Sequence, residues 1–174
     1  MDDGVTIWTD GSGRAHAVRD GHAGGFGYVA TYGSRRIEGS GCIKCATSNQ
    51  MELAAIYVGL RAVRHGFPIE VMSDSKYSVM ALTVWRHKWK MCGWINSVGG
   101  DVANRRMIEA IGGLIEEHEE AGGEVSLVHI RGHVGITENE RADTLAGIAR
   151  KEHLKLRNDV VHDEVQRLVD SCNL

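Results

Sequence analysis

The chain opens with alternating hydrophobic and polar positions. Residues 5–9 alternate and are rich in β-branched and aromatic side chains, and similar segments at 25–32 and 35–43 follow after short breaks that contain glycine. A period of two, interrupted by glycine, predicts three successive strands. Connections this short predict that the strands pair antiparallel. We therefore expect the chain to begin with a β-meander.

The hydrophobic positions after residue 50 recur at helical spacing, at Leu53, Ile56, Tyr57, Leu60 and Val63. This spacing predicts a helix that ends near residues 65–66. The pattern then alternates between the two periods, and it predicts a strand at 69–72, a helix at 75–85, a helix at 101–121 that two glycines weaken, and a strand at 124–130. Strands that alternate with helices predict β-α units after the meander.

A last pair of helical segments follows. Thr137 and Glu140 have the spacing of a capping box, so we expect Thr137 to cap a helix that runs through Arg150. Small apolar residues form a packing stripe along it, at Ala142, Leu145, Ala146 and Ala149. An amphipathic stretch covers 154–169. The element order predicts an α/β fold: a mixed five-stranded sheet, with three antiparallel strands and then β-α units, flanked by helices.

Length and composition narrow the class of protein. The 174 residues fit one domain, which we place at 1–152, with 153–174 as a helical extension of the same domain. The fractions of hydrophobic residues (43%) and charged residues (25%) are typical of a globular chain. No apolar run is long enough to span a bilayer, and the first residues lack the features of a signal peptide. We therefore expect a cytoplasmic protein without a membrane partner.

Charge and cysteine content exclude two simple interpretations. Lys and Arg number 20 against 23 Asp and Glu, a net charge of −3, so binding to nucleic acid would have to rest on local charge. Four cysteines are too few for a disulfide scaffold. Cys42 and Cys45 have the spacing of half a zinc site, but no second pair follows at zinc spacing, so we reject that interpretation.

Four acidic residues lie where predicted strands end or helices begin: Asp10, Glu52, Asp74 and Asp143. Singly, each could be an ordinary cap or loop carboxylate. If the first and fourth strands are neighbours, however, Asp10 and Asp74 leave adjacent strands, and the helices could bring the other two beside them. Like charges this close raise one another's pKa unless a cation lies among them. Mg²⁺ prefers such oxygen ligands, and two ions about 4 Å apart can hold both reacting oxygens of a phosphodiester.

Short motifs surround these acids, in the order Thr9-Asp10-Gly11-Ser12, Asn49-Gln50-Met51-Glu52-Leu53, Ser73-Asp74-Ser75, Gly132-His133-Val134-Gly135 and Glu138-Asn139-Glu140-Arg141-Ala142-Asp143. In this order they resemble type 1 ribonuclease H, the endonuclease that cuts the RNA strand of an RNA/DNA hybrid, over about residues 4–150. The resemblance implies two Mg²⁺ ions, for which Mn²⁺ could substitute. It also implies water as the nucleophile, with 5′-phosphate and 3′-hydroxyl ends as products.

The resemblance also implies roles for individual residues. Asp10, Glu52, Asp74 and Asp143 match the catalytic, metal-binding carboxylates of the family. His133 matches its mobile histidine, which assists proton transfer or product release without being a metal ligand.

Other positions match the family's contacts to the minor groove, where RNA presents its 2′-OH groups: Gly11, Ser12, Asn49 and Gln50. Lys76 stands where many relatives carry glutamine, and we include it among the substrate-binding residues. Residues 13–25 lack the usual Asn-Pro-Gly loop.

Residues 85–94 interleave three tryptophans with Arg86, Lys88 and Lys90. This segment resembles the basic protrusion that grips the DNA strand in bacterial members of the family. Cationic side chains would neutralise phosphates, and Trp85 would stack on a sugar or a base. The alternative is a helix end whose tryptophans serve the core, and we expect both interpretations to be partly true.

The expected partner is an RNA/DNA hybrid, bound by a monomer with no obligatory protein partner. Two alternatives remain. A non-catalytic hybrid-binding module would gain by losing the four carboxylates, which repel phosphate. A related two-metal DNA nuclease of the transposase type would have less use for Asn49, Gln50 and the tryptophan-rich segment.

Overall fold

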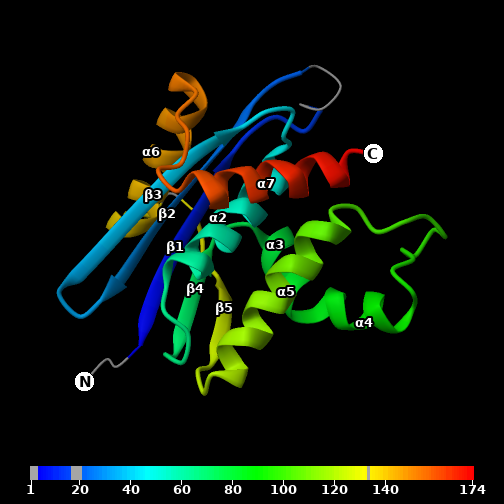
Figure 1. Cartoon of the computed structure of the whole chain (residues 1–174), viewed down its shortest axis with the longest axis horizontal. Coiled ribbons are helices and arrows are strands. Elements are labelled where there is room, and N and C mark those ends of the chain that lie inside the picture. The colour runs from blue at the N-terminus through cyan, green and yellow to red at the C-terminus, as the bar shows by residue number, and fades with distance from the viewer. Residues whose placement is uncertain (1–3, 17–20, 133) are drawn as a thin grey trace.

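The computed structural model describes residues 4–16, 21–132 and 134–174. Its centre is a five-stranded sheet in the order β3-β2-β1-β4-β5 (Figure 1). The meander consists of β1 (Val5–Ser12), β2 (Gly24–Tyr32) and β3 (Arg35–Ile43), all paired antiparallel. The strands β4 (Ile69–Ser73) and β5 (Val125–His129) extend the sheet in parallel from β1. The predicted α/β fold with a mixed sheet is confirmed.

Helices cover both faces of this sheet, and their bounds are α2 (Ser48–Ala62), α3 (Lys76–Met80), the π-helix η1 (Ala81–Trp85), α4 (Arg86–Met91), α5 (Arg105–Glu120), α6 (Thr137–Glu152) and α7 (Asp159–Cys172). On one face, α6 packs against the three strands of the meander, whereas α2, α5 and α7 pack together on the other face. None of the described helices is long and apolar enough to cross a membrane.

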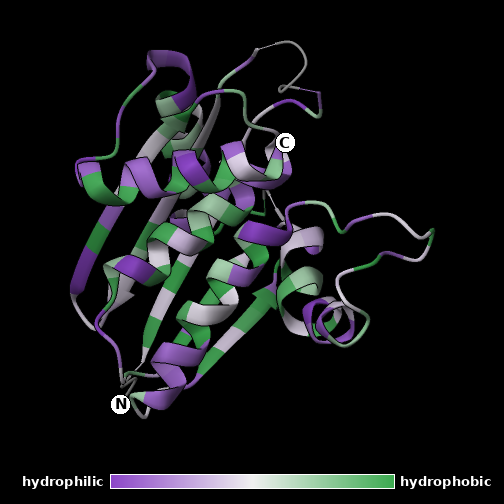
Figure 2. Ribbon diagram, turned by 45° about the vertical axis from the view of Figure 1, so that its right-hand side comes forward, coloured by the Kyte–Doolittle hydropathy of each residue, from purple (hydrophilic) through white to green (hydrophobic). Residues whose placement is uncertain are grey.

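The main core lies between the sheet and α2, which carries the predicted apolar face. Ile7, Phe26, Leu53, Leu60 and Ile111 are all fully buried there. Figure 2 shows hydrophobic residues along the inner strands, whereas the helices alternate between hydrophobic and hydrophilic residues. Most elements therefore bury one side, whereas residues 53–60 of α2 are buried all round, so α2 is held in place mainly by packing.

On the opposite face, α6 lies directly on the backbone of β2. Ala142, Ala146 and Ala149 are fully buried, as the predicted small-residue stripe requires. A Cβ added at Gly27 would lie 2.5 Å from the carbonyl oxygen of Ala142, and one at Gly25 would collide with the carbonyl of Ala146. Only glycine permits this approach, so the glycines of β2 and the alanines of α6 together set the height of α6 above the sheet.

The predicted start of α6 is wrong. Thr137 is the first residue of the helix, whereas Ile136 is the N-cap and no side chain caps it. Thr137 cannot cap because it already lies inside the first turn. A complete capping box instead opens α2, where the Thr47 hydroxyl accepts from Gln50 N and the Gln50 side chain accepts from Thr47 N.

Three other predicted bounds change. The helix expected at 101–121 begins only at Arg105. The helix expected at 75–85 does not end at Trp85, because it continues through η1 and α4 to Met91. The amphipathic stretch at 154–169 becomes helical only from Asp159, and the helix then runs on to Cys172. The division of the chain into 1–152 and 153–174 stays a prediction.

Candidate active site

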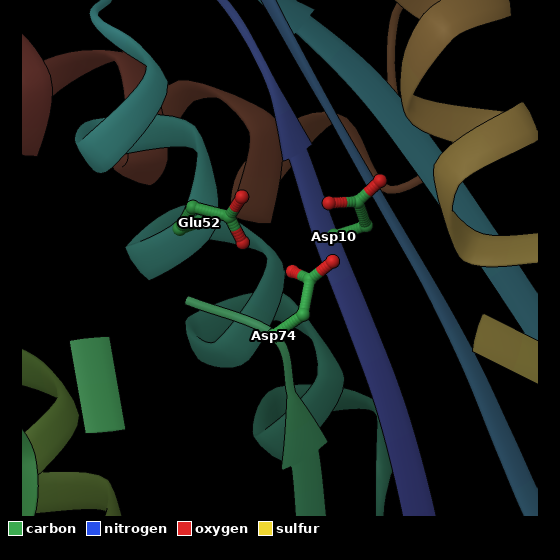
Figure 3. Close-up of side chains that lie close together, drawn as sticks. All are labelled: Asp10, Glu52 and Asp74. Atoms are coloured by element: carbon green, nitrogen blue, oxygen red, sulfur yellow. The ribbon is translucent and has the colours of Figure 1, made fainter. Parts of the chain in front are cut away.

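Three carboxylates meet at one edge of the sheet. Asp10 belongs to β1, and Asp74 directly follows β4. Because these parallel strands are neighbours, with Thr9 opposite Ser73, both acids leave the sheet at the same edge. Glu52 joins them from α2. One oxygen from each side chain lies within 4.8 Å of the other two, and Figure 3 shows the three carboxylates close together.

Gly11 explains why Glu52 can come so close to Asp10. A Cβ at Gly11 would lie 2.6 Å from the carbonyl carbon of Met51 and 2.9 Å from the Cα of Glu52. Any other residue would therefore push β1 away from α2. Gly11 also donates its backbone N–H to Asp10 Oδ1, at 2.9 Å. Its substrate contact stays a prediction, but the structure already gives it a packing role.

The fourth acid, Asp143, reaches the cluster through the close packing of α6. Gly27 lies opposite Asp10 in the sheet and directly under Ala142. The next residue of α6 is Asp143, whose side chain is hydrogen-bonded to that of Asp10. The convergence of Asp10, Glu52 and Asp74 agrees with the sequence analysis, whereas the metal-binding role of all four acids stays a prediction. Nothing in the sequence analysis indicated the glycines of β2 that bring Asp143 beside Asp10.

Burial and the neighbouring negative charges disfavour the charged forms of Asp10 and Glu52. Burial raises the pKa of Asp10 to about 8, helped by the hydrogen bond to Asp143 and by the charges of Asp74 and Asp143. Burial also raises the pKa of Glu52 well above its usual range, and the charges of Asp10 and Asp74 add to this effect. Without a cation, the cluster therefore tends to hold protons.

The cluster has the ligand chemistry of a hard divalent cation. Its donors are all carboxylate oxygens, which Mg²⁺ and Mn²⁺ prefer. Glu52 Oε2 is buried and has no hydrogen-bond partner among the described residues. A buried, unpaired oxygen is costly unless something binds it, so the residues present fit a metal ion.

Gly132, from the Gly132-His133-Val134-Gly135 motif, and His129, which the sequence analysis did not single out, both lie against Asp74. A Cβ at Gly132 would lie 2.5 Å from Asp74 Oδ2, so the chain passes tightly against that carboxylate. His129, at the end of β5, places Nε2 3.1 Å from the Asp74 carbonyl oxygen. For His129, the sequence signal was its place at the end of β5, beside the end of β4. His133 follows Gly132 but lies outside the described residues, so its role stays a prediction.

The predicted substrate-binding residues near the cluster differ in how far their side chains are exposed and free of internal hydrogen bonds. Asn49 is exposed in the first turn of α2, Lys76 is exposed at the start of α3, and Ser12 is partly buried at the end of β1. Gln50, by contrast, is only 2% exposed. Its Oε1 accepts from Thr47 N at 2.9 Å and its Nε2 donates to Asn173 Oδ1 at 2.8 Å. The structure thus gives Gln50 internal partners, and its contact with substrate stays a prediction.

The tryptophan-rich segment contains three rings in series. Trp85 and Trp89 are partly buried, with ring centroids 5.6 Å apart, and Trp94 is buried beyond them. This arrangement agrees with the expectation that the tryptophans partly serve the core. Figure 1 shows α4, which carries Trp89, projecting to one side of the sheet.

The three cations of this segment differ as well. The Arg86 side chain is 14% exposed, packs against Gly112 and lies 3.6 Å from a carboxylate oxygen of Glu116. Lys88 and Lys90 are exposed, and neither forms an ion pair with another described residue. The two lysines are therefore better placed than Arg86 to meet phosphates, although all three assignments stay predictions.

Comparisons with known proteins agree with this geometry. The RNase H family model matches residues 2–151. The chain is 34% identical to a ribonuclease H of Neisseria gonorrhoeae over 146 residues, which cover 84% of this chain and 94% of that protein. It is 41% identical to a ribonuclease H of Syntrophotalea carbinolica over 123 residues, or 71% and 78% of the two chains. A crystal structure of LC9-RNase H1, a type 1 RNase H with the type 2 active-site motif, shares the fold with a TM-score of 0.65 at 22% identity, covering 98% and 84%.

Proposed function

The chain belongs to the RNase H family, and on that premise we propose that its carboxylate cluster hydrolyses the RNA strand of RNA/DNA hybrids with two bound Mg²⁺ ions. Family membership makes the chain a ribonuclease H. The number and identity of the ions belong to the proposal. The observation that carries it is the convergence of Asp10, Glu52 and Asp74 within 4.8 Å, with one buried oxygen of Glu52 that has no partner in the described part of the chain.

Each carboxylate has a definite task in this proposal. Asp10, Glu52, Asp74 and Asp143 hold and orient the ions. Asp10 and Glu52 give up protons to do so, because their pKa values are raised when no ion is bound. When bound, two Mg²⁺ ions supply Lewis acidity and positive charge for the attack of water on the phosphodiester and for the departure of the 3′ oxygen. Mn²⁺ accepts the same ligands and could replace Mg²⁺.

The remaining residues position the duplex and move protons. His133 assists proton transfer or product release beside the cluster. Gly11, Ser12 and Asn49 lie at the edge where the minor groove would meet the cluster. Lys88 and Lys90, with Lys76 nearer the cluster, offer positive charge to the backbone phosphates.

Three properties are proposed on the sequence alone: a cytoplasmic location, a monomeric state and the absence of an obligatory protein partner. The alternative of a two-metal DNA nuclease is decided by the assay below. The alternative of a non-catalytic binding module is disfavoured by the cluster itself, since carboxylates repel phosphate unless a cation is bound.

The test compares three labelled duplexes, RNA/DNA hybrid, double-stranded DNA and double-stranded RNA, in the presence of Mg²⁺. We expect cleavage of the RNA strand of the hybrid only, leaving 5′-phosphate and 3′-hydroxyl ends. Ca²⁺ should bind without supporting cleavage, because its looser coordination does not hold the reacting groups in line. Asp74→Asn should abolish cleavage, and the exposed Asp163→Asn on α7 is the matched control. Equal cleavage of DNA, or an active Asp74 variant, would refute the proposal.

A further inference from the structure

The segment after α6 lies beyond the part of the chain that the family model matches, which ends at residue 151. It is nevertheless built into the core. Val161, Val165 and Val169 recur every four residues along one face of α7, and all three are buried. Through this face α7 packs against α5, α2 and β3 (Figure 1). The end of the chain is therefore held firmly enough to position other residues.

The polar side of α7 holds the loop that precedes α2, residues 44–47. Gln166 pairs with the backbone of Lys44 in both directions, since its Oε1 accepts from Lys44 N at 3.0 Å and its Nε2 donates to Lys44 O at 3.3 Å. Just after α7, Asn173 Nδ2 donates to the carbonyl oxygen of Cys45 at 2.9 Å, and Asn173 Oδ1 accepts from Gln50 Nε2 at 2.8 Å. We call these four hydrogen bonds the C-terminal latch.

The latch acts on a backbone conformation that needs support. Cys45 has φ +51°, in the left-handed region that residues other than glycine disfavour. Its carbonyl is the group that Asn173 holds. On its other side the loop is confined by the residue that follows β1, because a Cβ at Gly13 would lie 3.0 Å from the carbonyl carbon of Thr47. The latch therefore sets where the first turn of α2 begins.

That turn carries a group proposed to touch the substrate. Thr47 is the N-cap of α2, and Asn49 is exposed in the first turn, two residues after the cap. Gln50 links the cap to Asn173, since its amide oxygen accepts from Thr47 N while its amide nitrogen donates to Asn173. The path from Asn173 to the exposed Asn49 is therefore short and consists of hydrogen-bonded groups with defined partners.

We propose that Asn173 is a positioning residue for hybrid binding, which acts through Cys45 and Gln50 to hold the first turn of α2 in the orientation that presents Asn49 to the duplex. This inference rests on the proposed function. Glu52 is fixed separately, by the packing of Gly11 against the α2 backbone. Loss of the latch should therefore weaken binding of the hybrid and leave the chemical step nearly unchanged.

Two variants of Asn173 and one control test this. Asn173→Ala removes both hydrogen bonds of the side chain, whereas Asn173→Asp keeps an acceptor for Gln50 and loses the donor to Cys45. Asn158→Ala is the matched control, because Asn158 caps the opposite end of α7 by accepting from Val161 N. It removes an asparagine hydrogen bond from the same helix without touching the loop.

The measurements are the Kd for an RNA/DNA hybrid in Ca²⁺, and KM and kcat in Mg²⁺. We expect Asn173→Asp to raise Kd and KM about three- to tenfold, the effect of losing one hydrogen bond, and Asn173→Ala, which loses two, to raise them at least as much. For both variants kcat should stay within about twofold of the parent. Backbone hydrogen exchange at residues 46–50 should accelerate in Asn173→Ala. The control Asn158→Ala should change none of these quantities, although its thermal stability should fall.

Unchanged Kd and unchanged exchange in Asn173→Ala would overturn the inference. An equal rise of KM in Asn158→Ala would also overturn it, because the effect would then come from a general loosening of α7. If the parent protein does not cleave hybrids at all, the proposed function fails instead. Hydrogen exchange at residues 46–50 then tests separately whether the C-terminal latch holds the first turn of α2.

Discussion

Asp10→Asn should make the metal-free protein more stable while abolishing its activity. The substitution removes one negative charge from a buried cluster at nearly constant volume. The new amide oxygen can still accept from the N–H of Gly11, and the amide nitrogen can donate to Asp143, which is already bonded to Asp10. Activity should be lost because a ligand of the proposed metal site is gone.

The size of the stabilisation follows from the raised pKa of Asp10. The usual value is 3.8, whereas burial and the neighbouring acids raise the pKa in the folded protein to about 8. Between these values the folded protein binds more protons than the unfolded chain, so the free energy of unfolding falls as pH rises. The stability that depends on protonated Asp10 is fully present below about pH 4 and lost as pH rises through about 8. The slope is at most about 1.4 kcal/mol per pH unit.

At pH 7 the free energy of unfolding lost through Asp10 reaches about 4 kcal/mol as an upper limit, because pH 7 lies about three units above the usual pKa of 3.8. Sharing of protons within the cluster reduces the net effect, so we expect Asp10→Asn to gain about 1–4 kcal/mol at pH 7. The assay is urea denaturation in a metal chelator at pH 5, 6 and 7. The difference between the variant and the parent should grow with pH.

The matched control is Asp101→Asn, in which the exposed carboxylate lies in the loop before α5. This variant removes the same charge outside the cluster, so it should lack the gain in stability at pH 7 that is expected of Asp10→Asn. Mg²⁺ should stabilise the parent more than Asp10→Asn, by mass action on the folded state. If Asp10→Asn were less stable than the parent at pH 7, or if the difference between them did not change with pH, the conclusion that the cluster raises the pKa of Asp10 would be refuted.

Three further predictions address the surroundings of the cluster. Neutralising Lys88 and Lys90 together should lower the slope of log K for hybrid binding against log[salt] by up to about 2 units with kcat unchanged, and an unchanged slope would place the phosphate contacts elsewhere. Gly27→Ala should lower the free energy of unfolding in urea by about 1–3 kcal/mol and reduce kcat, because α6 must move. The control Gly147→Ala on α6 places its Cβ in open space and should not destabilise the protein. Equal effects of the two substitutions would contradict the close packing of α6 on β2. His133→Ala should lower kcat ~10²-fold, while calorimetry should find the Mg²⁺ affinity retained, and a lost affinity would make His133 a ligand.

The sequence by itself determined the elements and the neighbourhood of the acids. Periodicity of two and of 3.6 is a local property, so the meander and the apolar face of α2 followed from residues close together in the chain. Asp10 and Asp74 were placed at strand ends by the same local pattern. Their proximity then needed only one further assumption, that β1 and β4 are neighbours, which the sheet order confirms.

Tertiary structure decided how closely these elements approach and which polar groups remain free. The contact of Gly27 with Ala142 joins residues that are far apart in the chain, and no local pattern shows that a missing Cβ is needed there. The amide of Gln50 is held by Asn173, 123 residues away, and its contact with substrate stays a prediction. Arg86 lies against α5 beside Glu116, and its contact with phosphate likewise stays a prediction. A side chain takes the partner that packing brings within reach, and packing depends on the whole chain at once.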